Sequence, residues 1–221
     1  MKSNNISFST EKYLMFTTCF SKSKSSRDIL IDLLKKENIN TQLLTDVNQI
    51  HSDKVLVVNK PGNHGDADGI IKSGDKNLIL FIKTADCVPI FIYDDVNNNY
   101  GIVHAGWRGA KKKIHLKAID KFIDLGSDLN NLNFIMGPSI KPCCYEVGKE
   151  MVDDFKGSII KKNNSYYLDL NKSIMVDLVK KGVESNKIKI DNSCTFGDST
   201  LHSYRRDKES SGRMLSCIVV K

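Results

Sequence analysis

The stretch TADCVPIFIYDDVNNNYGIVHAGWRG, residues 84–109, decides the fold of the chain around it. The apolar run Val88–Tyr93 predicts a strand, three asparagines then form a turn, and Tyr100–His104 predicts a second strand. In such a hairpin the start of one strand lies beside the end of the other. We therefore expect the thiol of Cys87 and the imidazole of His104 to meet at one edge of a sheet.

A third candidate ligand, His51, lies upstream of a predicted strand at Val55–Val58. Two histidines and one cysteine offer two neutral nitrogens and a thiolate, which suit zinc. Three protein ligands would leave a fourth position for water or substrate, as in catalytic zinc sites. The spacing of the three residues matches no local metal motif, so residue type alone indicates the metal here.

Cys87 has two other interpretations. A strand cysteine often behaves as a small buried hydrophobe. It could also be a thiolate nucleophile activated by His104. A cysteine–histidine pair of that kind needs an orienting carboxylate or amide, so the presence of His51 favours zinc.

Seven short motifs, including those that contain the candidate ligands, follow one another along the chain: QIHS (Gln49–Ser52), DADGII (Asp66–Ile71), TADCVPI (Thr84–Ile90), HAGWRG (His104–Gly109), MGPSIKPCCYEVG (Met136–Gly148), SCT (Ser193–Thr195) and HSYRRDKESSGRM (His202–Met214). In these motifs and their order the chain resembles the YfiH-like family, also called the laccase-domain or polyphenol oxidase family, which includes purine nucleoside phosphorylases. The resemblance implies that His51, Cys87 and His104 bind a catalytic zinc ion.

The resemblance also implies the fold and the activity. The fold would be α+β, a layered α-β-β-α sandwich with mixed sheets, shared with the cytotoxic necrotizing factor catalytic domain. The activities would be phosphorolysis of adenosine, inosine and methylthioadenosine, and deamination of adenosine. The partners would be a purine nucleoside and phosphate.

Each of the two reactions needs further side chains beside the zinc ligands. Deamination needs a carboxylate to move protons beside the zinc-bound water. Asp86 and Asp68 are both candidates for this role; we assign Asp86 as catalytic and Asp68 as substrate-binding. Phosphorolysis needs cations that match phosphate oxygens, and Arg108 and Arg205 are the candidates.

The arginines have a structural interpretation as well. Arg206, a further candidate phosphate ligand, stands beside Asp207, so that either arginine of the Arg205–Arg206 pair could form an ion pair. Trp107 could stack on a base or anchor the core. The family also carries an arginine where this chain has Cys19, and we therefore expect weak binding of phosphate.

Composition limits the class of protein. The chain has 221 residues, 40% of them hydrophobic, enough for one domain spanning residues 1–221. The net charge of +7 reflects either surface lysines or attraction for an anion such as phosphate. The lysine runs are short and no basic-aromatic motif occurs, so we expect no nucleic-acid partner.

The cysteines and the N-terminus bear on location. Six cysteines occur without a signal peptide or an apolar run long enough to span a membrane, which predicts a cytoplasmic protein with reduced thiols and no membrane partner. Cys143 and Cys144 are expected to be unpaired thiols in a turn that lines the pocket. Cys194 is expected to be buried and inert. A homo-oligomer is compatible with the sequence.

The other elements follow from apolar periodicity. The continuous runs Leu78–Ile82 and Val88–Tyr93 predict central strands buried on both faces. The remaining expectations are disorder or a short edge segment at residues 1–10, a loop at Pro61–Asp68, and helices at 110–125, at 147–157 and from Asn171 to Gly182. His64 is expected in a solvated loop and His115 at the surface or packed.

Two other functions compete with the zinc enzyme. A copper polyphenol oxidase would need many paired histidine ligands, whereas the chain has five histidines and no HxH motif. A binding protein that keeps the fold without catalysis is favoured only by Cys19 and the short loop after it.

Overall fold

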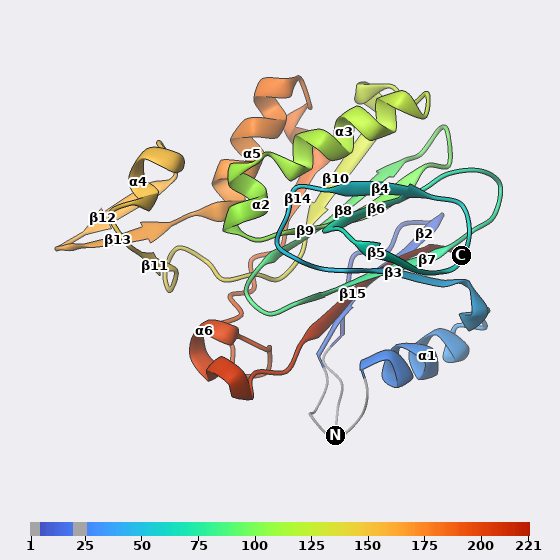
Figure 1. Ribbon diagram of the computed structural model, residues 1–221, viewed down its shortest axis with the longest axis horizontal. Coiled ribbons are helices and arrows are strands. Elements are labelled where there is room, and N and C mark those ends of the chain that lie inside the picture. Colours follow the sequence, from blue (N-terminus) through green and yellow to red (C-terminus); the bar gives the residue numbers. More distant parts are fainter. Residues whose placement is uncertain (1–4, 20–25) are drawn as a thin grey trace.

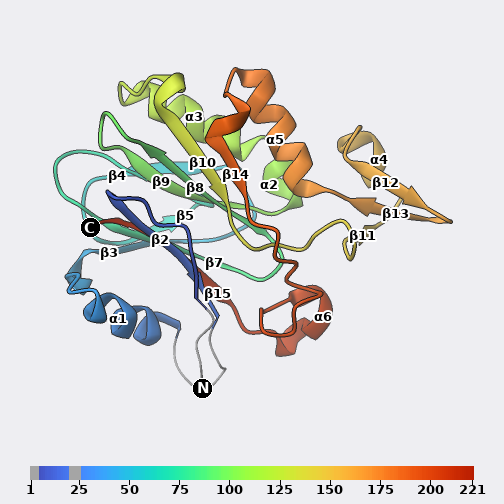
Figure 2. The ribbon, with the colours of Figure 1, turned by 180° about the vertical axis from the view of Figure 1, so that it is seen from behind.

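The computed structural model describes residues 5–19 and 26–221 (Figure 1). Within this part of the chain, two six-stranded mixed sheets pack face to face, and helices cover their outer faces. A small three-stranded sheet projects from one side in both views (Figures 1 and 2). The predicted α-β-β-α sandwich with mixed sheets is therefore confirmed.

The first sheet contains, in spatial order, β1 (Asn5–Ser7), β2 (Tyr13–Thr18), β15 (Met214–Val220), β7 (Ile79–Thr84), β3 (Leu44–Asn48) and β5 (Gly62–Asp66). The second contains β14 (Ile188–Ile190), β10 (Leu132–Met136), β8 (Val88–Asp94), β9 (Tyr100–Ala105), β6 (Gly69–Lys72) and β4 (Val55–Val58). The small sheet contains β11 (Glu146–Val147), β13 (Ser165–Leu168) and β12 (Ile159–Lys162).

The α-helices are α1 (Ser26–Lys36), α2 (Trp107–Lys111), α3 (Ile114–Asp124), α4 (Met151–Asp154), α5 (Leu170–Lys181) and α6 (Tyr204–Asp207). Short 3-10 helices lie at Thr41–Leu43, Leu129–Asn131, Ser185–Lys187 and Lys208–Ser210. None of the helices in the described ranges is long and apolar enough to cross a membrane.

Successive side chains of the central strands point to opposite faces of the sheet, and both faces are buried. In β7, Leu80 and Ile82 face the other sheet, whereas Ile79 and Phe81 pack toward α1. Strand β8 alternates in the same way between the core that joins the sheets and the core under α3 and α5, and its residues are all buried. Because each face meets a different layer, a continuous apolar run is the pattern that such a strand requires.

Three elements differ from the sequence-based expectations. The expected helix at 110–125 is two helices, α2 and α3, because Lys113 adopts a left-handed conformation with φ 61°. The expected loop at Pro61–Asp68 contains β5, which pairs in parallel with β3 at the sheet edge. The expected helix at 147–157 is reduced to the single turn of α4, and β12 follows it.

The structure also differs from expectation at the start of α5 and defines the N-terminal segment of the chain. Helix α5 is capped by Asp169, whose carboxylate accepts from the Lys172 backbone N–H, and not by Asn171. Gly182 ends the helix in a left-handed conformation, as predicted. Residues 5–7 form the edge strand β1, and residues 1–4 and 20–25 lie outside the described part of the chain.

Candidate metal centre and substrate cleft

The β8–β9 hairpin brings Cys87 and His104 together. The register pairs Val88 with Ala105 and Pro89 with His104, so Cys87, directly before β8, lies at the edge where β9 ends. This is the arrangement that the apolar runs and the asparagine turn predict. Both His104 and His51 lie within hydrogen-bonding reach of the Cys87 thiol.

His51 reaches the same point on a loop organised by Asp68. The Asp68 carboxylate accepts hydrogen bonds from three successive backbone N–H groups, those of Ile50 at 3.3 Å, His51 at 2.9 Å and Ser52 at 2.5 Å. His51 itself has φ 57°, a conformation that costs free energy for a residue other than glycine. The carboxylate offsets this cost because it satisfies the N–H groups that the turn points inward.

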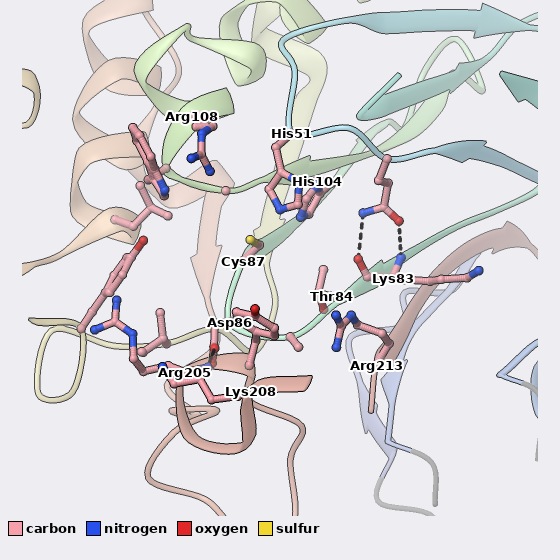
Figure 3. A pocket seen from close by; sticks show the side chains of 18 of the residues that line it. His51, Lys83, Thr84, Asp86, Cys87, His104, Arg108, Arg205, Lys208 and Arg213 are labelled. Carbon is pink, nitrogen blue, oxygen red and sulfur yellow. Dashed lines mark hydrogen bonds between the residues drawn. The ribbon is translucent and has the colours of Figure 1, made fainter. Parts of the chain in front are cut away.

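Gln49 fixes the other end of this loop. Its side-chain amide donates to the Lys83 carbonyl and accepts from the Lys83 N–H, both at 2.8 Å (dashed lines in Figure 3). The two hydrogen bonds resemble those between paired strands, and they attach the loop to the end of β7. The QIHS motif therefore combines an anchor, Gln49, with a candidate ligand, His51.

The three candidate ligands form a compact donor set. The ligand atoms of His51, Cys87 and His104 all lie within 4.8 Å of one another. The two imidazoles meet edge to face, with ring centroids 4.8 Å apart and planes at 77°. Two imidazoles and a thiolate that converge in this way fit zinc by donor type and by spacing.

Gly106 leaves the space that this convergence needs. A Cβ at Gly106 would lie 3.0 Å from the Cys87 sulfur and 3.3 Å from Cδ2 of His51. Its backbone is extended, with φ −74° and ψ 171°, so close approach and not torsional freedom requires glycine here. A larger residue would push the Cys87 sulfur or the His51 ring away from the shared point.

Electrostatics favours the ligating form of Cys87. Burial by itself would raise the pKa of the thiol, but the charge of His104 and hydrogen bonds from both histidines outweigh burial and lower that pKa. Burial would lower the pKa of His104, but the Cys87 thiolate and the hydrogen bond to Asp68 raise it instead. Both shifts favour the thiolate form of Cys87, which is the form that binds metals.

A cleft of about 860 Å³ opens over these residues. Its lining includes His51, Cys87 and His104, together with aromatic side chains at Trp107, Tyr145 and Tyr204. Among the described residues, five cations line it against three carboxylates: Lys83, Arg108, Arg205, Lys208 and Arg213 against Asp46, Asp86 and Glu209. A basic, partly aromatic cleft suits a ligand that carries both an anion and a flat ring.

Asp86, Arg108 and Arg205 all lie at this cleft, as their assignment requires. Asp86 has φ 85°, and its carboxylate accepts from the Thr195 hydroxyl at 2.7 Å and from the Arg205 N–H at 2.6 Å. The Arg108 guanidinium lies 4.3 Å from the centre of the Trp107 ring. In the view of Figure 3, Arg108 lies above Cys87 and Arg205 lies below it, both to its left.

Two of the expected substrate contacts need correction. The Asp68 side chain is fully buried beneath His51 and His104 and does not line the cleft, so it positions these residues and does not contact substrate. The Arg206 guanidinium donates to the carbonyls of Thr195, Phe196, Asp198 and Leu201 and pairs with Asp207. The Arg206 guanidinium therefore stabilises the loop at residues 195–201 and is not available to phosphate.

Sequence reasoning missed Lys83, Tyr145, Lys208 and Arg213 at the cleft. Tyr145, Lys208 and Arg213 belong to quoted motifs, and that membership was the available signal. The Arg205 guanidinium lies 5.3 Å from the centre of the Tyr145 ring and donates to the Glu146 carbonyl at 2.7 Å. These contacts join the segments around residues 145 and 205 into one wall.

The cysteines near this wall also differ from expectation. The Cys143 sulfur lies 3.2 Å from that of Cys144 and 3.7 Å from that of Cys194, and all three are free thiols. Cys194 is only partly buried and belongs to this cluster, so it is not the isolated buried thiol that we expected. Neither Cys143 nor Cys144 lines the cleft; their neighbour Tyr145 does.

The histidines outside the site have other partners. His115 is buried, as one of our two interpretations had it, and its Nε2 lies 3.0 Å from the Asp177 carboxylate. His64 contacts the Lys60 carbonyl at 2.9 Å. His202 lies against Gly212. None of the three joins a group of metal-ligating side chains within the described residues.

Solved structures share the fold of this chain. It superposes on the hypothetical protein YfiH of Bacillus licheniformis with a TM-score of 0.85 and 23% identity, covering 95% of this chain and 93% of that one. It superposes on YlmD of Geobacillus stearothermophilus with a TM-score of 0.81 and 23% identity, covering 95% and 92%.

Curated relatives are more similar in sequence. A purine nucleoside phosphorylase of Clostridium acetobutylicum is 35% identical over 196 residues, 84% of this chain and 80% of that protein. One of Aquifex aeolicus is 36% identical over 173 residues, 78% and 80% respectively. A family model described as multi-copper polyphenol oxidoreductase laccase matches residues 24–221. With that match over most of its length, the chain belongs to the family of YfiH-like, laccase-domain proteins.

Proposed function

We propose that this protein is a zinc-dependent purine nucleoside phosphorylase acting on adenosine, inosine and methylthioadenosine. The observation that carries the proposal is the position of His51, Cys87 and His104 at a cleft lined by cations and aromatic rings. Cations suit phosphate, and aromatic faces suit a purine. The names of the curated relatives support the same activity.

His51, Cys87 and His104 would hold the zinc, and Asp68 would orient His104 from behind. Bound zinc supplies Lewis-acid chemistry and lowers the pKa of a bound water to about 7. The remaining steps belong to the cleft's own side chains.

In phosphorolysis, a phosphate oxygen forms a bond to C1′ of the ribose while the bond from C1′ to the purine nitrogen breaks. The bonding electrons leave with the purine, which takes up a proton. Arg108, Arg205 and Arg213 hold the phosphate oxygens through charge-assisted hydrogen bonds. Trp107 and Tyr145 hold the base, and the products are the free base and ribose 1-phosphate.

Asp86 is the residue that we assign to proton transfer. Its carboxylate faces the cleft, and the Thr195 hydroxyl and the Arg205 N–H fix its direction. A fixed carboxylate beside a metal-ligand set also favours a second activity, deamination of adenosine, in which water replaces the amino group and ammonia leaves. Both activities require the base to be held near His51 and His104.

The donor inventory argues against the copper polyphenol oxidase. His64, His115 and His202 lie apart from the site, so the described residues offer two imidazoles where a multicopper cluster needs many. A binding protein without turnover is the remaining alternative. A cytoplasmic location, a single domain and a homo-oligomer stay predictions.

The test is product analysis with the zinc-loaded protein and adenosine. We expect ribose 1-phosphate only when phosphate is present, and ammonia with or without phosphate. Cys87→Ala should abolish both products, whereas Cys217→Ala, at a buried cysteine in β15 away from the cleft, should retain them. Adenosine that binds without giving either product would identify a binding protein, and oxygen consumption with phenols would identify an oxidase.

A further inference from the structure

A second cluster of metal-ligating side chains lies behind the wall of the cleft. Cys143 and Cys144 stand in the turn after Pro142, and Cys194 stands on a separate segment. The three sulfur atoms lie within 4.8 Å of one another, with separations of 3.2 and 3.7 Å around Cys143. We propose that Cys143, Cys144 and Cys194 bind a thiophilic metal ion, Zn²⁺ or Cu⁺, at a site distinct from His51, Cys87 and His104.

The sulfur separations fit such an ion. Tetrahedral zinc with bonds of about 2.3 Å to sulfur holds two thiolates roughly 3.8 Å apart. The pair Cys143 and Cys194 already has this spacing, at 3.7 Å. The pair Cys143 and Cys144 needs to open by only about half an ångström, which a small side-chain rotation provides. Three thiolates are a soft donor set, which selects zinc or cuprous copper over magnesium or calcium.

Backbone contacts hold the two segments in place. Ser139 and Cys194 form a parallel bridge, and the Thr195 N–H donates to the Ser139 carbonyl at 3.2 Å. The turn that carries the adjacent cysteines is closed by a hydrogen bond from the Cys144 N–H to the Lys141 carbonyl at 2.9 Å. The donors are thus presented by a framework that does not depend on the metal.

The surroundings of Cys194 suit a thiolate ligand. Backbone N–H groups of Lys141, Phe196 and Gly197 donate to its sulfur. Such donors stabilise the negative charge on a metal-bound sulfur. The Lys141 ammonium interacts electrostatically with Cys143 and Cys194, as well as with Asp169 and Asp191. It would balance the net negative charge of a divalent ion bound by three thiolates.

The arrangement is less suited to a disulfide. The sulfurs of Cys143 and Cys144 lie 3.2 Å apart, whereas a disulfide bond is about 2.05 Å long and strained between adjacent residues. Cys143 is exposed, so a metal ion and a water ligand can reach the cluster. Binding would release the thiol protons to solvent, and affinity should therefore fall as pH falls.

A metal ion at this site would stabilise the side of the cleft that contains Tyr145 and Arg205. Cys144 directly precedes Tyr145, whose ring lies under Arg205, and Cys194 directly precedes Thr195, whose hydroxyl donates to Asp86. The ion would therefore cross-link the two segments that carry these contacts. It would act as a structural clamp and would not contact substrate.

The test is a Cd²⁺ titration under reducing conditions, followed by thiolate-to-metal charge-transfer absorption in the ultraviolet. The Cys87→Ala background removes the only sulfur of the first site. In this background we expect one tightly bound equivalent with strong absorption. Adding Cys143→Ser or Cys194→Ser should weaken binding at least 100-fold, whereas adding Cys217→Ala should leave it unchanged. Elemental analysis after dialysis should show the same pattern for Zn²⁺.

Circular dichroism of the metal-free variants establishes that they fold. Cys143 is exposed, so Cys143→Ser should fold even if Cys194→Ser does not. Unchanged Cd²⁺ affinity in a folded Cys143→Ser variant would overturn the proposal, and so would the absence of sulfur-to-metal absorption in the Cys87→Ala protein. Because Cys87 is absent throughout, these outcomes are independent of the enzymatic activity proposed above.

Discussion

The Asp68 carboxylate accepts a hydrogen bond from Nδ1 of His104 at 2.8 Å, and both side chains are buried. This contact fixes the tautomer of His104, so that Nε2 is the nitrogen left to bind a metal. The same carboxylate shapes the His51 loop through its hydrogen bonds to three backbone N–H groups. One residue thus orients two candidate ligands that lie 53 positions apart in the sequence.

The first prediction concerns this carboxylate. Asp68→Asn puts an amide where an oxygen accepts from the Ser52 N–H and hydroxyl, so the loop must shift. We expect zinc affinity to fall 10- to 100-fold, about 1.4 to 2.7 kcal/mol, measured by competition with a chelator. Asp66→Asn is the matched control, because Asp66 is exposed in the same region and its carboxylate accepts a hydrogen bond from the Asn48 amide. Equal affinity in both variants would refute this role of Asp68.

The second prediction concerns the space beside the Cys87 sulfur. Gly106→Ala places a methyl group 3.0 Å from that sulfur, so the thiolate or the His51 ring must move. We expect kcat for adenosine to fall at least 10-fold with little change in melting temperature. Gly197→Ala controls for the substitution itself, because its Cβ would make only ordinary contacts, at 3.7 Å. A fully active Gly106→Ala enzyme would contradict the close approach that we describe.

The third prediction separates the two proposed reactions. Only phosphorolysis must hold a phosphate, so Arg108→Lys, which keeps the charge but loses the planar fork, should raise KM for phosphate about 10-fold. Ammonia release from adenosine should change little. Lys162→Ala, on β12 outside the cleft, controls for the general effect of removing a cation. Parallel loss of both products would show that Arg108 serves a step that they share.

The fourth prediction concerns stability and pH. Burial lowers the pKa of His115 below its ordinary value of 6.5, while its partner Asp177 stays ionised because hydrogen bonds from His115 and Lys113 outweigh burial and lower the Asp177 pKa. The unfolded chain therefore protonates His115 more readily than the folded protein does. As pH falls below 6.5, the free energy of unfolding should decrease, by at most about 1.4 kcal/mol per pH unit.

Urea unfolding of the metal-loaded protein at pH 7.5 and 5.5 measures this effect. His115→Gln should be less stable than the wild type at pH 7.5 but should lose less stability on acidification. His64→Gln, at a partly exposed histidine in β5, should keep the pH dependence of the wild type. An unaltered pH dependence in His115→Gln would assign the acid sensitivity to another group.

Local patterns made the layers and the hairpin predictable. The apolar run of β8, the asparagine turn and β9 are contiguous, so the meeting of Cys87 and His104 follows from strand pairing alone. The break between α2 and α3 was not predictable, because Lys113 is neither glycine nor proline and gives no signal of its left-handed conformation. Strand β5 also lacked a signal, since its sequence GNHGD has no apolar alternation.

In the candidate site, too, some residues were predictable from the sequence and others were not. Strand pairing, donor type and the family resemblance together selected His51, Cys87 and His104. The positions of Asp68 and Arg206 depend on contacts with loops distant in sequence. The motif DADGII predicts a substrate contact at Asp68, because nothing in it shows that this carboxylate turns inward. The cysteine cluster was missed for a related reason, since Cys194 lies about 50 residues from Cys143 and meets it only in the folded chain.

Strand β15, residues 214–220, lies in the interior of the first sheet, between β2 and β7. During synthesis on the ribosome, the pair β1–β2 and the strands β7, β3 and β5 therefore lack the strand that connects them until residue 220 has emerged. The loop that carries Arg205 and Arg213 immediately precedes this strand, so the cleft cannot be completed before the sheet is. A nascent chain would present the two histidines and the cysteine early but could hold substrate only once β15 has joined the sheet between β2 and β7.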